Sequence, residues 1–490
     1  MRTFWTSVQS LSSGKVVTRP QKDFALLHRY TIMTAEFDEL FSIGSIEAEY
    51  LALLRSRHDF LRNRPRILPG SDRIDIDLFH RNRMRSFSAI HRKIMGSKSN
   101  NTPCRYTFSA FLEREVPKPE STKIRTISIS TISDTIVQRL LQKHIEPAVE
   151  SRLCQSAYGF RKRRTAHHAV YKVREHLNGG LNFVFEADIQ EFFDKIDRKS
   201  LVVMVNDLEI DIRAKHLIYR FLHSDRVLPV HVAEDRNRAG RTVAYTITKR
   251  SSGVPQGGVL SGMLTNLYLS KFDKILSAYM GYVRYADDFV VCCSSPEQVE
   301  EVRSLVTKSL AELKLALHPT KTSQPTQMES RSVEFLGFEI AREKLSVRKK
   351  NISRFKKRIS LVISSHKGCD HNVFKLNRLL RRLRYKVCGP TNEELDRTSF
   401  GDRPILKYRR CWIGFFRIVS DIQQMKQLDR WICASVSKYA WMKLGMRIKR
   451  ADIRKRGLPS LVNILFRSRK INKQETKLQC SILSRYPFSS

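Results

Sequence analysis

Residues 282–293 read YVRYADDFVVCC, two β-prone runs joined at a pair of adjacent carboxylates, Asp287 and Asp288. The pattern predicts a β-hairpin with an acidic turn. The two neighbouring negative charges repel each other, and a bound divalent cation would remove that repulsion. Upstream, residues 182–188 read NFVFEAD and predict another apolar strand, which ends in Asp188. Three carboxylates at the ends of two strands are the ligands that two-metal phosphoryl transfer needs.

Residues 186–197 read EADIQEFFDKID and lead from this strand into a helical turn. The backbone carbonyl of Ile189 is a candidate further oxygen ligand beside Asp188. Phe193 would lie beside the sugar of an incoming nucleotide, where an aromatic ring leaves a 2′-hydroxyl neither room nor a hydrogen-bond partner. The motif therefore predicts selection of dNTP over rNTP, and an ordinary strand-to-helix turn is the alternative interpretation.

A glycine-rich segment, residues 252–261, reads SGVPQGGVLS and predicts a nucleotide pocket. Its proline sets a turn, its glycines permit close backbone approach, and Gln256 offers a donor and an acceptor together. With Gly257 it would suit a nucleotide and the templating base. Lys123 and Arg125, spaced i and i+2 on a predicted strand, project from one face and could clamp a triphosphate. A solvated basic edge strand is the alternative.

Other cations stand where phosphates would be bound. Lys321, in the HPTKT segment of residues 318–322, follows a predicted strand and could act on the leaving pyrophosphate as a cation or an acid. Tyr158, Arg161 and Arg163 bring an aromatic ring and cations into one loop, which suits base stacking and phosphate contact in nucleic acid. A charged loop alone would explain these three residues equally well.

The composition indicates a polyanionic partner. The chain has 490 residues, enough for two or three domains, and 89 Lys and Arg against 48 Asp and Glu give a net charge of +41. Such an excess opposes compact folding unless a polyanion neutralises it; nucleic acid is the usual one, and ribosomal or anionic membrane surfaces are the alternative. The nine Cys form no C-x-x-C pair, which disfavours a zinc ribbon or a disulfide framework. Because no long apolar run occurs either, we expect a cytoplasmic protein without a membrane span.

In this order the segments resemble the reverse transcriptase family, and most of all its group II intron-like branch, which includes free-standing phage-defence enzymes. The likeness runs from about Pro117 to Phe338 and is carried by STKIR, AYGFR, ADIQEFFDKID, GVPQGGVLS, YADD, HPTKT and FLGF. PGSD at residues 69–72 resembles the branch's N-terminal segment. The resemblance implies an α+β right-hand polymerase, with fingers and a palm built on a ferredoxin-like antiparallel sheet, followed by an α-helical thumb.

The resemblance also implies a function and a set of sites. It implies an RNA-directed DNA polymerase that uses two Mg²⁺ ions, an RNA template and dNTPs to make DNA. The three carboxylates would be the catalytic, metal-binding triad, and the nucleotide contacts would be those named above. In the helical region, cations and aromatic residues alternate as an RNA-binding surface would, with Arg384, Trp412 and Arg417 as candidates. An amphipathic bundle with a basic outer face is a compatible interpretation.

Changes of composition along the chain, together with the resemblance, imply five parts. A basic leader, a basic helical extension, the fingers and palm, a helical thumb or maturase-like region and a basic tail would occupy residues 1–33, 34–110, 111–345, 346–450 and 451–490. We expect the leader to be disordered, although it faintly resembles an organellar transit peptide. Met33 is an alternative start of translation.

Departures from the family's pattern bear on the biological role. Intron-encoded members typically read Ser-Pro where this chain reads Ser261-Gly262, and Ser where it has Ala157. Residues 227–249 carry their own charged sequence, and no His/Cys-rich endonuclease domain follows the thumb. These features favour a free-standing antiphage defence enzyme over a group II intron reverse transcriptase and maturase. A non-catalytic maturase is disfavoured by the intact carboxylates, and an RNA-directed RNA polymerase by Phe193.

Overall fold

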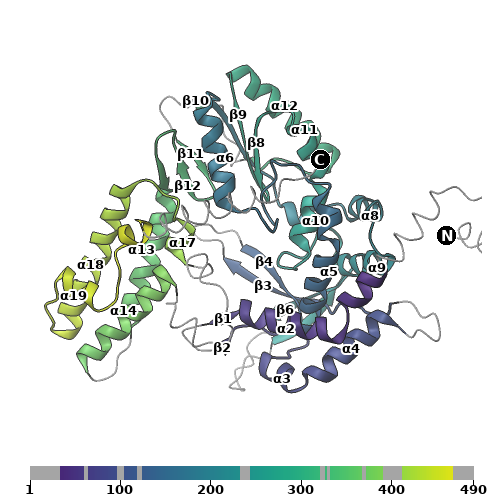
Figure 1. Cartoon of the computed structure of the whole chain (residues 1–490), viewed down its shortest axis with the longest axis horizontal. Helices are drawn as coiled ribbons and strands as arrows, with labels where there is room; N and C mark the ends of the chain where they lie inside the picture. The colour runs from purple at the N-terminus through teal and green to yellow at the C-terminus, as the bar shows by residue number, and fades with distance from the viewer. Residues whose placement is uncertain are drawn as a thin grey trace, which may run out of the picture.

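The computed structural model describes residues 34–59, 64–96, 104–117, 124–231, 243–319, 326–327, 332–366, 371–389 and 411–466. Two four-stranded sheets lie one above the other in Figure 1, and a helical lobe stands beside them. The predictions for the leader, for Lys123 and for Lys321 lie outside the described residues.

The upper sheet is an antiparallel palm sheet in the order β10-β5-β9-β8. The palm elements are α6 (Ala166–Asn178), β5 (Phe183–Asp188), β8 (Gly281–Tyr285), β9 (Asp288–Cys293), α12 (Pro296–Glu312) and β10 (Thr326–Gln327). Successive residues of β5 face opposite sides of the sheet, so Val184 lies in one hydrophobic core with α6 while Phe185 lies in another with α12. Helices therefore cover both faces of the palm sheet (Figure 1).

The lower sheet forms the fingers, in the order β4-β3-β6-β7. Its strands are β3 (Phe111–Pro117), β4 (Ile124–Ile129), β6 (Arg226–His231) and β7 (Val243–Thr248). Two antiparallel hairpins are joined by a parallel pairing of β3 with β6. The chain leaves this sheet after β4, builds the first palm strand and returns through β6 and β7, so the fingers and palm are interleaved in the sequence.

Helices surround both sheets. They are residues 34–40, α2 (Ile43–Ser56), α3 (Ile76–Arg81), α4 (Arg83–Met95), α5 (Ile132–Glu150), α7 (Phe192–Lys195), α8 (Arg198–Asn206), α9 (Ile212–Leu222), α10 (Ser261–Tyr268) and α11 (Ser270–Leu276). A two-residue pair, β1 (His58–Asp59) with β2 (Arg64–Pro65), follows α2. Phe37 and Phe41 are fully buried in the same core as Phe185 of the palm, so the N-terminal helices and the palm pack as one body.

The helical lobe is the thumb, joined to the palm by a small antiparallel sheet. That sheet consists of β11 (Val333–Phe335), β12 (Phe338–Ile340) and β13 (Leu345–Val347). The thumb helices are α13 (Lys349–Ser364), α14 (Asn372–Cys388), α17 (Trp412–Phe415), α18 (Ile422–Leu444), α19 (Arg450–Lys455) and residues 461–466. On α14, Leu376, Leu379, Leu380 and Leu383 are buried, which is the spacing of one helix face against a core.

This architecture confirms the predicted α+β right-hand fold, with an antiparallel palm sheet, a fingers sheet and a helical thumb. The domain boundaries stay predictions. Near the last of them, at residue 450, Leu458, Leu461 and Leu465 are buried in the thumb core, so packing continues into the segment expected to be a basic tail. Within the described ranges, no helix is both long and apolar enough to cross a membrane.

Candidate active site

Two of the predicted carboxylates face each other across neighbouring palm strands. Asp188, the last residue of β5, is paired directly with Asp288, the first residue of β9. Asp287 lies beside them in the two-residue turn that joins β8 to β9. The turn is strained, because Ala286 has a φ of 60°, a conformation that costs a residue with a Cβ about 1–2 kcal/mol. Such strain persists only where the surroundings hold it.

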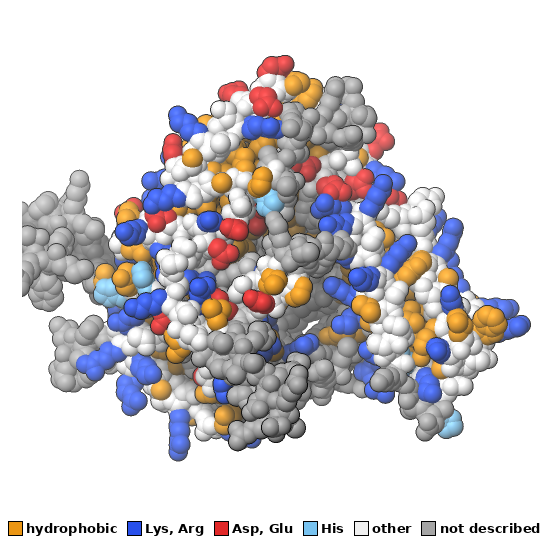
Figure 2. Space-filling model, turned by 180° about the vertical axis from the view of Figure 1, so that it is seen from behind, with side chains coloured by type: hydrophobic (Ala, Val, Ile, Leu, Met, Phe, Trp, Pro, Cys, Tyr) orange, Lys and Arg blue, Asp and Glu red, His pale blue; other side chains and the backbone are white. Residues whose placement is uncertain are grey.

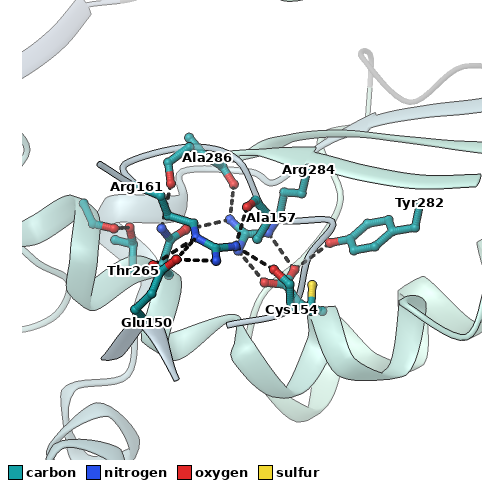
Figure 3. Close-up of polar contacts among 12 residues, drawn as sticks. Glu150, Cys154, Ala157, Arg161, Thr265, Tyr282, Arg284 and Ala286 are labelled. Atoms are coloured by element: carbon teal, nitrogen blue, oxygen red, sulfur yellow. Dashed lines mark hydrogen bonds and ion pairs between the residues drawn. The ribbon is translucent and has the colours of Figure 1, made fainter. Parts of the chain in front are cut away.

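A buried arginine holds this turn. Arg284 on β8 has no exposed surface, and its Nη1 donates to the Ala286 carbonyl at 2.8 Å (Figure 3). Its Nε donates to Asp273 of α11 at 2.6 Å, and Asp273 also accepts a 2.6 Å bond from the Tyr282 hydroxyl. Asn266 on α10 accepts a further bond at 3.1 Å. Because a buried charge needs full compensation, this network ties the acidic turn to two helices.

The loop before α6 presses on the same turn from outside the sheet. Tyr158 N–H donates to the Arg284 carbonyl at 2.8 Å, and Arg284 N–H donates to Ser156 at 2.9 Å, as in a parallel strand pair. A Cβ added at Gly159 would lie 2.5 Å from the Ala286 nitrogen. Only glycine permits that approach, which explains the glycine of the AYGFR motif.

The predicted nucleic-acid contacts in this loop differ in position. The Arg161 side chain is only 4% exposed, and its guanidinium binds Glu150 and donates to the Cys154 and Ala157 carbonyls at 2.6 and 2.7 Å (Figure 3). Tyr158 is also buried, whereas Arg163 is exposed. Arg161 therefore has a structural role in folding the loop, and the contact of all three with nucleic acid stays a prediction. Sequence reasoning could not separate a buried cation from an exposed one.

Burial shapes the charge of the triad. Asp188 is 6% exposed. Burial, and then the neighbouring Asp287 carboxylate, raise the pKa of Asp288 to about 6, with Arg348 acting in the opposite direction. Closely spaced carboxylates that resist ionisation are a donor set suited to a hard divalent cation. Among the described residues, no three His, Cys, Asp or Glu side chains are gathered tightly enough to hold a metal ion, so ligation by the triad stays a prediction.

Residues around the triad complete its surroundings. Ile189 is buried, and its N–H donates to the Asp287 carbonyl at 3.3 Å, while its own carbonyl as a ligand stays a prediction. Glu186 was missed by sequence reasoning, although its position two residues before Asp188 puts it on the same strand face. Burial raises the pKa of Glu186 to about 7, and the Glu334 N–H donates to it at 3.2 Å.

The segments that carry Phe193, Gln256 and Gly257 meet at the junction of fingers and palm. The Phe193 carbonyl accepts a 2.8 Å bond from Val254 N–H, and the Gln256 carbonyl accepts one at 2.8 Å from Ser128 on β4. Gly257 has a φ of 122°, and an added Cβ would meet the Ser128 carbonyl at 2.7 Å. The glycine-rich segment thus connects Phe193, the residue predicted to exclude a 2′-hydroxyl, to β4. The exposed Arg125 also lies on β4.

A polar pocket of about 300 Å³ opens beside Gln256. Asp194 and Ser128 line it, together with Glu113 and Arg250, which form a buried ion pair. Its lining includes Ser252 and Gln256 of the glycine-rich segment and none of the three candidate carboxylates. It gives Gln256 a polar environment on the fingers side.

The thumb carries the remaining candidates and much exposed basic charge. Arg384 and Arg417 are half-buried, and the Trp412 ring stacks on Phe355 with centroids 4.1 Å apart. Trp412 therefore contributes to the thumb core, and nucleic-acid contact by the three stays a prediction. Figure 2 shows Lys and Arg side chains spread over the helical lobe. Exposed cations on α13 and α14 are Lys349, Lys350, Lys357, Arg358, Arg378, Arg381 and Lys386.

Fingers, an antiparallel palm with acidic strand ends and a helical thumb define a right-hand polymerase fold. Residues 116–340 match the family described as reverse transcriptase (RNA-dependent DNA polymerase). This segment, slightly less than half of the chain, is thus similar to reverse transcriptase domains.

Two curated relatives are similar over parts of the chain. The group II intron-encoded protein LtrA of Lactococcus lactis subsp. cremoris is 32% identical over 33% of this chain and 24% of its own length. Protein YkfC of Escherichia coli (strain K12) is 28% identical over 47% of this chain and 66% of its own length. The chain thus spans less than two thirds of these relatives. The apo telomerase of Candida tropicalis aligns with 79% of this chain and 67% of its own at a TM-score of 0.41 and 13% identity.

Proposed function

We propose that the chain is an RNA-directed DNA polymerase that makes cDNA from an RNA template by two-metal nucleotidyl transfer. The observation that carries the proposal is the direct pairing of Asp188 with Asp288, beside Asp287 in a turn held by Arg284. The pairing lies inside the segment that matches the reverse transcriptase family. Two Mg²⁺ ions held by these carboxylates would supply charge neutralisation at the reacting phosphate.

The chain's own residues would orient the substrates. The Gln256 and Gly257 segment, hydrogen-bonded to β4, would support the incoming nucleotide, and Arg125 would pair with its phosphates. The Phe193 ring would exclude a ribonucleotide's 2′-hydroxyl. Positioning of this kind contributes a large part of the rate in phosphoryl transfer, because the reactants are held in line.

An RNA template and a DNA product are the partners that we propose. The net charge of +41 and the exposed cations of α13 and α14 support binding to a phosphate backbone. Cytoplasmic location is part of the same proposal.

For biological role we propose a free-standing antiphage defence enzyme. Its support is the set of departures from intron-encoded members, above all Gly262 in place of proline. A group II intron-encoded reverse transcriptase and maturase is the second candidate, favoured by the similarity to LtrA. Intron RNA structure around the gene would favour the second, and a neighbouring defence cluster or noncoding RNA the first.

Primer extension tests the polymerase proposal. The variant Asp287→Ala/Asp288→Ala should lose incorporation of dNTP on an RNA template while RNA affinity stays close to that of the wild type. Lys308→Gln, an exposed change on α12, is the control and should keep full activity. If the double variant extends the primer as the wild type does, the assignment of the site is wrong.

A further inference from the structure

Phe193, the residue predicted to exclude a 2′-hydroxyl, is in contact with an aromatic ring from a segment distant in the sequence. Phe160, in the loop between α5 and α6, meets Phe193 edge to face, with centroids 6.3 Å apart and ring planes at 90°. Phe192 packs against Phe193 from within its own helix, with centroids 5.6 Å apart. Such aromatic contacts fix ring orientation as well as burying area. The orientation of the Phe193 ring therefore depends on Phe160.

The backbone around Phe160 fixes the direction of its side chain. Phe160 has a φ of 57°, a left-handed conformation that residues with a Cβ rarely adopt. On one side, Gly159 lies against Ala286 and its carbonyl accepts a 2.7 Å bond from Asn266. On the other, Arg161 is clamped by Glu150 and two carbonyls. Phe160 remains 46% exposed, so its ring is held in place although it is not buried in the core.

Gly262 provides the space that the Phe160 ring occupies. A Cβ added at Gly262 would lie 2.5 Å from two ring atoms of Phe160 and 3.0 Å from a third. Gly262 lies in the first turn of α10, where glycine is a poor helix former. The residue is thus unfavourable for the helix but necessary for the ring.

We propose that Phe160, seated against Gly262, is a specificity-determining residue that holds the Phe193 ring where it excludes a 2′-hydroxyl. The inference rests on the proposed function and deepens it, because it states how the sugar of the nucleotide is selected. Phe160 acts through Phe193. Without the Phe160 ring, Phe193 can turn away from the sugar, and a ribonucleotide then fits.

The test compares dATP with ATP, which differ only at the 2′ position. The ratio of kcat/KM for dATP to that for ATP should fall about tenfold in Phe160→Ala, because one lost apolar packing contact is worth roughly this factor. In a Phe193→Ala background, which has already lost the ring that would exclude the 2′-hydroxyl, Phe160→Ala should leave the ratio unchanged. A residue that merely supported the fold would lower both rates together and leave the ratio intact.

Two matched variants sharpen the test. Tyr219→Ala removes an aromatic side chain of similar exposure, 51%, on α9 and should not alter the ratio. Gly262→Ala should also lower the ratio of kcat/KM for dATP to that for ATP in the otherwise wild-type chain, because its Cβ displaces the Phe160 ring that holds Phe193. In the Phe160→Ala background the same change should have no such effect.

The outcomes separate the inference from the proposed function. If the wild-type chain incorporates dATP but Phe160→Ala keeps the ratio within twofold, Phe160 does not set sugar selectivity. Equal effects of Phe160→Ala with and without Phe193 would show that the two rings act independently, which also overturns the proposal. If Phe160→Ala is poorly folded, the ratio of kcat/KM for dATP to that for ATP is measured in Phe160→Leu instead, and the same outcomes apply. No incorporation by the folded wild-type chain would instead reject the polymerase function, and the inference with it.

Discussion

The acidic turn of the palm and the basic helices of the thumb use charge in opposite ways. In the palm, Arg284 and Asp273 are fully buried, and Arg284 also donates to the Ala286 carbonyl in the acidic turn. On the thumb, cations such as Arg378 and Arg381 are exposed and the helix is held by leucines instead. Carboxylates that share metal ions must be positioned closely, whereas attraction to a phosphate backbone tolerates movement. The proposed catalytic site in the palm is therefore held rigidly, whereas the proposed binding surface of the thumb consists of exposed charges that need no fixed position.

Breaking the buried pair should have the largest effect. Arg284→Met leaves Asp273 as an uncompensated buried charge and releases the Ala286 carbonyl. We expect a loss of about 3–5 kcal/mol in the free energy of unfolding, measured by urea denaturation, and loss of primer extension.

A double variant separates stability from turn positioning. Asp273→Leu/Arg284→Met removes both charges and should recover most of the stability, because apolar replacements of a buried pair are often neutral. Primer extension should stay low, since the bond from Arg284 to the Ala286 carbonyl is lost. Recovery of full activity in this variant would show that the bond to Ala286 is dispensable.

Asp288→Asn tests the electrostatic strain in the palm at a smaller scale. Since the pKa of Asp288 is raised from 3.8 to about 6, its ionised form is disfavoured in the folded chain. The destabilisation is absent below the unfolded pKa of 3.8, grows between the two values and is complete above about 6. Without divalent metal, Asp288→Asn should raise the free energy of unfolding at pH 8 by on the order of 2 kcal/mol and leave it almost unchanged near pH 4. Equal melting shifts at the two pH values would contradict this.

Exposed thumb cations should have the smallest effect on stability. Arg378→Gln/Arg381→Gln should change the free energy of unfolding by less than about 0.5 kcal/mol. The slope of log affinity for RNA against log salt should become shallower by about one to two, because two phosphate contacts are lost. Lys308→Gln on α12 is the matched control and should keep the wild-type slope. An unchanged slope in the thumb variant would mean that this face does not bind RNA.

Features set by local sequence patterns could be predicted from the sequence, whereas features set by tertiary contacts could not. Adjacent Asp287 and Asp288 between two apolar runs predicted the hairpin, and another apolar run predicted the strand that ends at Asp188, because both patterns are local. Arg284 escaped notice, since its partner Asp273 lies on a helix and no periodicity links the two. Arg161 is predicted from the sequence as a nucleic-acid contact or part of a charged loop, and only its bonds to Glu150 and two carbonyls reveal that its side chain is buried.

The thumb shows a second limit. The resemblance implies a helical thumb, but it does not say which neighbouring helix each thumb helix meets. The stacking of Trp412 on Phe355 joins α17 to α13 and could not be foreseen from either segment alone. Contacts of this kind depend on tertiary packing, which composition and periodicity do not encode.

Manganese binding measured by calorimetry, with RNA template and primer present, tests most directly whether the palm carboxylates form a metal site. The wild-type chain should bind Mn²⁺, and its affinity should weaken as the pH falls below about 6, because protons compete at Asp288. Asp188→Asn/Asp288→Asn should lose this binding. Undiminished, pH-independent Mn²⁺ binding by that variant would contradict the account.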